Sequence, residues 1–329
     1  MTAVRGTGPL RLGTRRSLLA RTQSELVAQA LRRSSGREVD LVEVTTEGDV
    51  STAPLAQIGG TGVFVSALRQ ALIDDRIDLA VHSLKDLPTA SYDGVVVAAV
   101  PSREDPRDVL VARDGLSLGE LPAGSRVGTG SPRRAAQLRA LGLGLDVVAV
   151  RGNVDTRLRL VAAGTVDAVV LARAGLLRIG RAQEATEVLD PLQLLPAPGQ
   201  GALAVECRTA DSATRTAVAA LDDGPSRACT AAERALLATL EGGCMAPVGA
   251  LAEWAEGDAG PELFLRSVVV APDGSADLRR SATGPVDDPV GLGRRLAAQM
   301  LDDGAADVVG APPPHVHVLV SPAVQERKQ

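Results

Sequence analysis

Aromatic side chains and cysteines are both scarce in this sequence of 329 residues. Trp and Tyr occur once each and Phe twice, which leaves no platform on which nucleic-acid bases could stack. The cores must therefore be filled with Ala, Val and Leu. The cysteines are odd in number and widely spaced, so they predict neither a disulfide framework nor a zinc site; they are Cys207, Cys229 and Cys244.

Long apolar runs and an excess of basic residues are also absent. No segment approaches the roughly 18 apolar residues of a membrane helix, and the N-terminus lacks the apolar core of a signal peptide. The 35 basic and 40 acidic side chains give a net charge of −5, which argues against a nucleic-acid surface. We therefore expect a cytoplasmic protein with neither a membrane nor a nucleic-acid partner.

Lysine is almost missing as well. Apart from Lys328, the only lysine is Lys85, which lies beside Asp86 after the apolar run 77–81. Such a run predicts a buried strand, and ligands of open α/β sheets bind at strand ends. A flexible ammonium kept in an arginine-rich chain indicates a binding role, although an ordinary solvated Lys–Asp pair gives the same pattern. We expect the neighbouring His82 to support the turn.

Arginines follow a glycine-bearing turn near the N-terminus. After a short strand, Arg15 and Arg16 stand at the start of a helix that runs to about Arg33, with Thr14 or Ser17 as its cap. Cations are unfavourable at that end of a helix. The pattern therefore indicates an anion shared by guanidinium and helix N–H groups, with two solvent-exposed arginines as the alternative.

The segment 109–178 repeats this arrangement. Ser131 and Pro132 predict a helix start, and Arg133 and Arg134 follow it directly. The apolar runs 147–150 and 168–171 also lead into arginines, namely Arg151, Arg157, Arg173 and Arg178. Because arginines recur at several predicted strand ends, we favour a shared anion site over solvated surface.

The chain is long for a single core, so two or three domains are expected. The proline-bearing segments 101–108 and 196–201 indicate two crossings between α/β lobes, with a hinge and a cleft between the lobes. We predict a discontinuous first domain (1–102 and 202–224), a second lobe (103–201) and a small α+β domain (225–329).

The last of these domains begins with a predicted helix over 228–240. Thr230 and Glu233 have capping-box spacing, and the helix ends before Gly242-Gly243-Cys244. The runs 263–270 and 278–282 predict a hairpin, and a helix follows within 285–300. For His315 and His317 we favour a half-exposed edge strand over a metal site.

These features predict a cleft with one central carboxylate, Asp86, and one loop thiol, Cys244. Many guanidinium groups in an acidic protein indicate a ligand with several carboxylates or phosphates, and no GxxxxGK[ST] motif argues for a nucleotide. Without paired carboxylates or a Ser/His/Asp set, hydrolase chemistry is poorly supported. A lone carboxylate among cations suits a developing positive charge. The predicted rim is Arg11, Arg15, Arg16, Arg133, Arg134, Arg151, Arg157 and Arg178.

A series of motifs in this order resembles the hydroxymethylbilane synthase, or porphobilinogen deaminase, family. The resemblance covers about residues 10–305, and HSxKDxP with a downstream GGC is its most specific part. The motifs are GTRRS at 13–17, HSLKDLP at 82–88, GTGSPRR at 128–134, RGNV at 151–154, GQGA at 199–202 and GGC at 242–244.

The resemblance implies two lobes similar to type II periplasmic binding proteins and a small α+β domain that carries a dipyrromethane cofactor. It implies a transferase of porphyrin and haem biosynthesis that joins four porphobilinogen molecules head to tail, releases ammonia each time and hydrolyses the product free. Each pyrrole carries an acetate and a propionate, which agrees with an arginine-lined site. We expect a monomer.

The resemblance also implies a role for each matched residue. Asp86 matches the catalytic aspartate, and Cys244 would hold the cofactor through a covalent thioether. Further cofactor contacts fall on Lys85, Ser83, Thr129, Ser131, Arg133, Arg134, Arg157 and Gln200. Substrate contacts fall on Arg11, Arg15, Ser17, Arg151, Asn153, Arg178 and Phe64.

Two features depart from the family pattern. Family members often have lysines in the lid at about 50–62, where this chain has Gln57 and Thr61, and the tail after about 307 has no counterpart. Two other functions compete with the transferase: a non-catalytic two-lobed anion-binding protein, and an anion-sensing regulator, which would need a helix-turn-helix and a basic face.

Overall fold

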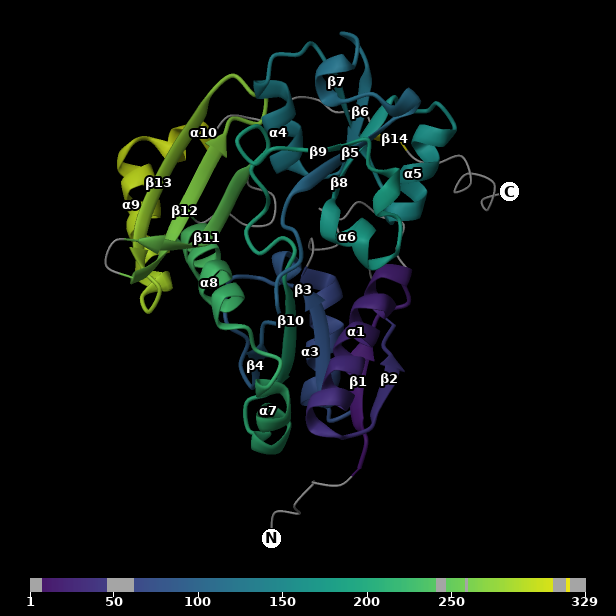
Figure 1. Ribbon diagram of the computed structural model, residues 1–329, viewed down its shortest axis with the longest axis vertical. Coiled ribbons are helices and arrows are strands. Elements are labelled where there is room, and N and C mark those ends of the chain that lie inside the picture. Colours follow the sequence, from purple (N-terminus) through teal and green to yellow (C-terminus); the bar gives the residue numbers. More distant parts are fainter. Residues whose placement is uncertain (1–7, 46–61, 241–246, 258–259, 310–317, 320–329) are drawn as a thin grey trace. The chain divides into compact units, whose positions relative to one another are not determined.

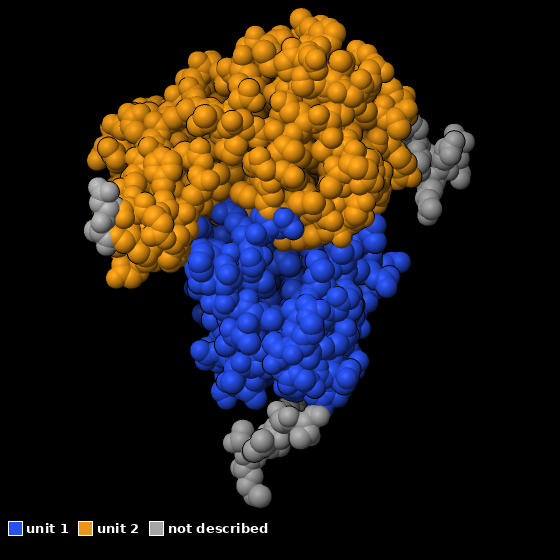
Figure 2. Space-filling view, viewed as in Figure 1, with its two compact units in different colours: residues 1–104, 201–230 blue, residues 105–200, 231–329 orange. Residues whose placement is uncertain are grey.

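The computed structural model describes residues 8–45, 62–240, 247–257, 260–309 and 318–319. The chain divides into two compact units, shown in different colours in Figure 2. Unit 1 comprises residues 1–104 and 201–230, and unit 2 comprises residues 105–200 and 231–329. None of the described helices combines the length and the apolar content needed to cross a bilayer.

Unit 1 is built on a five-stranded mixed sheet with the order β2-β1-β3-β10-β4 (Figure 1). The neighbours β2, β1 and β3 are parallel, whereas β10 runs antiparallel to both β3 and β4. The strands are β1 (Leu10–Thr14), β2 (Val39–Glu43), β3 (Leu79–Ser83), β4 (Val95–Ala99) and β10 (Leu203–Arg208). The helices of this unit include α1 (Leu18–Ser35), α3 (Gly62–Ile73) and α7 (Ser212–Ala219).

Both faces of this sheet are covered by apolar side chains. On one face, Leu12 and Val205 pack with Leu31 of α1 and Val218 of α7. On the other face, Leu68 and Leu72 of α3 pack with Ile77 and Ala80. Burial on both faces explains why β3 consists of a nearly continuous apolar run.

Helix α1 confirms the expectation for the first arginine-bearing turn. Ser17 is the N-cap, and its Oγ accepts a hydrogen bond from Ala20 N. The helix ends at Gly36, whose φ of 66° lies in the left-handed region that glycine adopts without strain. Val27, Ala28 and Leu31 form its buried face.

Unit 2 contains a second mixed sheet, with the order β14-β7-β6-β8-β5-β9. Strands β14, β7, β6 and β8 are parallel, and β5 is antiparallel to β8 and β9. The strands are β5 (Asp108–Ala112), β6 (Arg126–Thr129), β7 (Asp146–Val150), β8 (Ala168–Ala172), β9 (Glu187–Val188) and β14 (Val318–Leu319). The helices α4 (Pro132–Ala140), α5 (Val154–Ala162) and α6 (Arg173–Arg178) follow β6, β7 and β8.

A separate antiparallel sheet in unit 2 has the order β11-β12-β13. It consists of β11 (Val248–Gly257), β12 (Gly260–Val270) and β13 (Asp277–Pro285), with α9 (Pro289–Asp302) and α10 (Ala305–Val309) after it. The pairing of β12 with β13 confirms the predicted hairpin. The sequence pattern did not predict β11.

Helix α8 (Gly224–Thr239) begins earlier than expected, so the predicted capping box is wrong. Thr230 lies inside the helix, where its Oγ1 donates to Ser226 O. Glu233 is fully buried and accepts hydrogen bonds from Gly199 N and Ala252 N. The carboxylate therefore joins α8 to a loop and a strand of unit 2.

These elements form the predicted fold class: two α/β units with mixed sheets, and a small antiparallel sheet with helices near the C-terminus. Unit 1 contains two separate segments, and unit 2 holds both the second lobe and the C-terminal sheet. The three-domain division, the hinge and the cleft stay predictions. His315 and His317 lie outside the described residues, whereas the following β14 pairs with β7 at the edge of the sheet.

Candidate functional site

One edge of the unit 1 sheet brings together residues from two distant motifs. Strands β1 and β3 are adjacent and parallel, so the segments after Thr14 and after Ser83 leave the sheet at the same edge. Arg15 and Lys85 are half-buried there, and Asp86 is exposed. The structure thus places three of the predicted site residues at one edge.

The turn that carries Asp86 is held on both sides. Leu84 N donates to Ala202 O at 3.0 Å, and Gln23 Nε2 of α1 donates to Ser83 Oγ at 3.2 Å. Leu84 and Leu87 are buried in one apolar cluster. Asp86 therefore projects from a backbone that is anchored immediately before and after it.

Close packing explains Gly13, which belongs to β1 and not, as predicted, to the turn before α1. A Cβ at Gly13 would lie 2.4 Å from Ile77 Cδ1 and 2.9 Å from Leu68 Cδ2. Its absence lets β1 approach α3 and the start of β3 closely. In the turn between β1 and α1, the exposed Arg16 pairs with Glu43 at 3.3 Å.

The position of Arg11 argues against its predicted role in substrate binding. Its guanidinium contacts the Asp78 carboxylate at 2.8 Å and the Asp75 carboxylate at 2.9 Å. Asp78 immediately precedes β3, so Arg11 lies at the opposite end of these parallel strands from Asp86. Burial raises the pKa of Asp78, but the hydrogen bonds from Arg11 and Arg208 outweigh it and hold this pKa at about 2.

Unit 2 gathers predicted residues at an equivalent edge. Strands β6, β7 and β8 are parallel, so Thr129, Arg151 and the start of α6 lie where these strands end. Strand β5 runs in the opposite direction, and its first residue, Asp108, pairs with Ala172 at the end of β8. The buried carboxylate of Asp108 therefore lies at the same edge as the ends of β6, β7 and β8.

Asp108 organises this edge. It is fully buried, with carboxylate oxygens 2.7 Å from Arg133 Nη2, 2.8 Å from Arg134 Nη2 and 2.7 Å from Gln200 Nε2. Burial raises the pKa of Asp108, but the two guanidinium groups outweigh that effect and hold it well below the usual range. Gln200 Nε2 also lies 2.7 Å from Pro106 O. One carboxylate thus holds three predicted cofactor-binding side chains.

The turn between β6 and α4 carries predicted hydroxyl groups. Ser131 N donates to Thr129 Oγ1 at 3.2 Å, and Ser131 Oγ caps α4 by accepting from Arg134 N at 3.4 Å. A Cβ on Gly130 would lie 2.8 Å from Val150 O and 3.6 Å from Arg157 Nη2. The half-buried Arg157 therefore reaches this turn from α5.

The other residues predicted in unit 2 are more exposed. Asn153 caps α5 through its Oδ1, which accepts from Thr156 N at 2.9 Å. Arg151 and Arg178 are half-buried, and Arg178 is the last residue of α6. Three of the predicted polar side chains, Ser17, Ser131 and Asn153, are thus also helix caps.

Several predictions fall outside what the structure describes. Cys244 and the proposed lid, with Gln57 and Thr61, lie outside the described residues. Phe64 belongs to the first turn of α3, and its side chain lies outside the described part of the structure. The two cysteines that are described, Cys207 and Cys229, are buried. Burial raises the pKa of the Cys207 thiol to about 11, which makes it a poor nucleophile at neutral pH.

Sequence reasoning missed Asp108 and Glu206, two buried carboxylates. Glu206 interrupts the apolar strand β10, whereas Asp108 opens β5 at the end of the polar segment 101–108. A charged residue inside such a run requires a partner, because an unpaired buried charge is costly. That signal could have identified Glu206, but not its partners. Asp108 gives no such signal, because it follows a run of polar residues.

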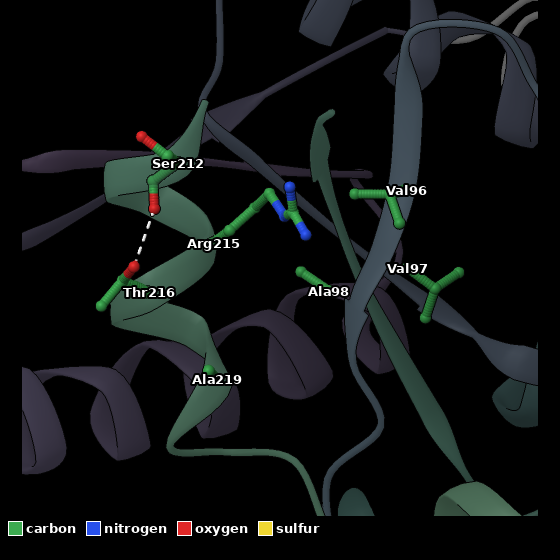
Figure 3. A pocket seen from close by; sticks show the side chains of 7 residues that line it. All are labelled: Val96, Val97, Ala98, Ser212, Arg215, Thr216 and Ala219. Carbon is green, nitrogen blue, oxygen red and sulfur yellow. Dashed lines mark hydrogen bonds between the residues drawn. The ribbon is translucent and has the colours of Figure 1, made fainter. Parts of the chain in front are cut away.

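A cavity of about 450 Å³ opens beside strand β4 (Figure 3). Its lining comes from β4 and α7 and contains none of the predicted site residues: Val96, Val97, Ala98, Ser212, Arg215, Thr216 and Ala219. It is separate from the two edges described above.

Each unit thus gathers guanidinium and hydroxyl groups where its parallel strands end, and unit 1 also presents an exposed carboxylate there, a pattern typical of proteins that bind polyanionic ligands. Two family models match the chain. The model of the porphobilinogen deaminase dipyrromethane cofactor binding domain matches residues 10–216, and that of the porphobilinogen deaminase C-terminal domain matches residues 227–302. The chain therefore belongs to the porphobilinogen deaminase family, whose members are transferases.

Two curated relatives agree with this assignment. Porphobilinogen deaminase 1 of Streptomyces coelicolor is 57% identical over 310 residues, which cover 92% of this chain and 97% of that protein. Porphobilinogen deaminase of Nocardia farcinica is 58% identical over 312 residues, which cover 93% and 89%. Among solved structures, a periplasmic substrate-binding protein of an ABC transporter from Coxiella burnetii is 15% identical, with a TM-score of 0.42 over 64% of this chain and 91% of that chain.

Proposed function

We propose that this chain joins four porphobilinogen molecules head to tail, with loss of ammonia at each addition and a final hydrolysis that releases hydroxymethylbilane. One observation carries the proposal. Arginine, serine and threonine gather where parallel strands end in both units, although the net charge of the whole chain is −5. Such an arrangement suits a substrate and product rich in carboxylates.

The substrate explains the number of guanidinium groups. Each porphobilinogen adds an acetate and a propionate, so negative charge accumulates as the product grows. A guanidinium binds a carboxylate through two parallel hydrogen bonds. We assign substrate binding to Arg15, Ser17, Phe64, Arg151, Asn153 and Arg178. Arg11 is not included, because Asp75 and Asp78 hold it at the other end of β1.

Asp86 is the proposed catalytic residue. When the C–N bond of the substrate's aminomethyl group breaks, ammonia leaves with the bonding electrons, and the remaining carbon shares its positive charge with the pyrrole. A carboxylate beside the ring stabilises this charge and accepts a hydrogen bond from the pyrrole N–H. Because Leu84 and Leu87 are buried on either side, Asp86 is held in position before the reaction.

The described residues fit a dipyrromethane with carboxylate arms. Two guanidinium groups share Asp108, so the cluster has an excess positive charge. The buried Nε atoms of Arg133 and Arg134 have no hydrogen-bond partner among the described residues. When bound, a dipyrromethane supplies the nucleophilic pyrrole carbon to which the first substrate is joined. We propose that it is held by Ser83, Lys85, Thr129, Ser131, Arg133, Arg134, Arg157, Gln200 and a thioether to Cys244.

We further propose that the enzyme is a cytoplasmic monomer without a nucleic-acid or membrane partner. The acidic net charge of −5 supports the absence of a nucleic-acid partner, because binding to a phosphate backbone needs a broad basic surface. A solution mass near 33.8 kDa from light scattering would support the monomer, and twice that mass would contradict it.

The Asp86→Asn variant tests the proposed function. The amide keeps the shape of the side chain but loses the negative charge, so turnover of porphobilinogen should fall by at least ~100-fold. Folding and covalent loading of the cofactor should persist, as circular dichroism and intact mass would show. Asp93→Asn, in an exposed position of the same unit, is the matched control and should retain activity. Near-normal turnover by Asp86→Asn would remove Asp86 from the mechanism.

A further inference from the structure

Three buried charged or titratable side chains contact one another inside unit 1. One of them belongs to β3, the strand that leads to Asp86, and the other two belong to its neighbours α3 and β10. Glu206 of β10 is 1% exposed, and Arg69 of α3 and His82 of β3 are each 7% exposed. Arg69 Nη2 lies 2.7 Å from Glu206 Oε1, and Arg69 Nε lies 3.1 Å from Glu206 Oε2. His82 Nε2 approaches Glu206 Oε2 at 3.1 Å. The carboxylate therefore contacts one neighbour on each of two elements.

The trio joins three elements that converge near Asp86. In Figure 1, α3 lies beside β3 and β10. His82 pairs with Ala204 in the register of β3 and β10, Ser83 pairs with Leu203, and then Leu84 N donates to Ala202 O. The buried contacts of Glu206 thus fix β3 at the last point before the chain turns toward Asp86.

Stability alone is a weak reason to keep these groups in a core. Removing charged side chains from water costs free energy, and apolar residues of similar volume often replace a buried ion pair without loss of stability. Around Glu206, β10 is otherwise built of buried apolar residues such as Val205 and Cys207. A carboxylate adds directional contacts that a leucine cannot make. Its hydrogen bonds define where the guanidinium of α3 must lie, and its Oε2 lies 3.1 Å from the imidazole Nε2 of β3.

We propose that Glu206, Arg69 and His82 are positioning residues for the condensation, because they set the position of the β3 end and thereby of the Asp86 carboxylate. The inference rests on the proposed function, in which Asp86 is catalytic. A displacement of about 1 Å at a reacting group can lower a rate by up to ~100-fold. The effect should therefore appear in kcat, while KM, which reflects arginines that the trio does not contact, stays nearly constant.

The main test replaces the ion pair by apolar side chains of similar volume, in the double variant Arg69→Met with Glu206→Leu. No unpaired charge remains in the core, so the protein should fold, and intact mass should show the covalent adduct. We expect kcat to fall at least tenfold with KM changed less than about threefold. Wild-type kcat in this folded variant would overturn the proposal.

Arg208→Gln is the matched control. Arg208 also belongs to β10, but it pairs with Asp78 and Asp211, and Asp78 precedes the other end of β3. Its loss should lower the melting temperature without lowering kcat. If the double variant does not fold, Glu206→Gln gives the answer: it keeps the side-chain shape, and an unchanged kcat would contradict the positioning role.

A mutant cycle separates this inference from the proposed function. If the trio acts through Asp86, the double replacement should lower turnover much less in an Asp86→Asn background than in the wild type. Additive effects would show that the trio acts elsewhere and would overturn the inference. By contrast, a wild-type protein that does not consume porphobilinogen, or an Asp86→Asn variant with normal turnover, would overturn the proposed function itself.

Discussion

At the scale of single residues, Asp108 is the carboxylate that holds the proposed cofactor-binding side chains of unit 2 together, although no motif identified it. One carboxylate contacts Arg133, Arg134 and Gln200, and through Gln200 it is linked to Pro106 O. Without it, two guanidinium groups would share a core with no opposing charge. The orientation of three proposed cofactor ligands therefore depends on a residue that need not contact the cofactor.

We predict that Asp108→Asn lowers the free energy of unfolding by roughly 3 kcal/mol, because it leaves buried guanidinium groups uncompensated. Urea titration of the purified variant measures this. The control is Asp114→Asn, an exposed residue that pairs with Arg113. Asp114 has a φ of 57°, which asparagine also tolerates, so this change should have little effect. Equal stability of both variants and the wild type would show that Asp108 does not hold the cluster.

Residue type and position along the chain were enough to identify the neighbourhood of Asp86, because a polar segment after a buried strand marks a sheet edge. Residue type and position along the chain did not predict where Arg11 lies. An arginine at the start of a strand and one at its end look alike in a sequence, and only the pairing of β1 with β3 shows that Arg11 lies beside Asp78. The partners of Glu206 could not be predicted for the same reason, since they come from α3 and β3.

At the scale of elements, the same side chains cap helices and form the proposed site. Ser17, Ser131 and Asn153 accept hydrogen bonds from the first turns of α1, α4 and α5, each of which follows a parallel strand. A strand, a short turn and a capped helix place both helix N–H groups and hydroxyl groups at one sheet edge. That arrangement is suited to bind carboxylates.

Substitutions of Ser131 separate these two roles. Ser131→Ala removes the cap of α4 and should lower the free energy of unfolding by about 1 kcal/mol. Ser131→Asp keeps a good cap but brings a negative charge to a site for carboxylates. We expect it to be as stable as the wild type in urea titration, with KM for porphobilinogen raised about tenfold, the effect of 1.4 kcal/mol of repulsion. An unchanged KM in Ser131→Asp would mean that the hydroxyl only caps the helix.

The sequence predicted most elements of both α/β units, because buried strands and capped helices leave strong local signals. The predictions from sequence were wrong or missing where tertiary contacts determine the structure. Thr230 and Glu233 have capping-box spacing, but α8 begins at Gly224, and Glu233 instead accepts hydrogen bonds from Gly199 N and Ala252 N. The pairing of β14 with β7 depends on residues far apart in the chain, so local pattern could not reveal it.

At the scale of the whole molecule, the charge distribution is the feature that function must explain. The chain is acidic overall, with a net charge of −5, but guanidinium groups gather at one edge of each unit. A ligand that gains carboxylates as it grows accounts for this contrast. The chain belongs to the porphobilinogen deaminase family, for which the growing pyrrole chain is such a ligand. The family model that matches residues 10–216 is that of its dipyrromethane-binding domain.

We propose that Cys244 carries that dipyrromethane covalently. Intact-mass spectrometry of the purified protein, from a host that makes porphobilinogen, tests it most directly. We predict that the wild type is heavier than its sequence by the mass of one dipyrromethane. Cys244→Ser should have only the sequence mass, whereas Cys229→Ser, a change at a buried cysteine, should keep the added mass. An unmodified wild-type protein, or an adduct that persists in Cys244→Ser, would contradict the account.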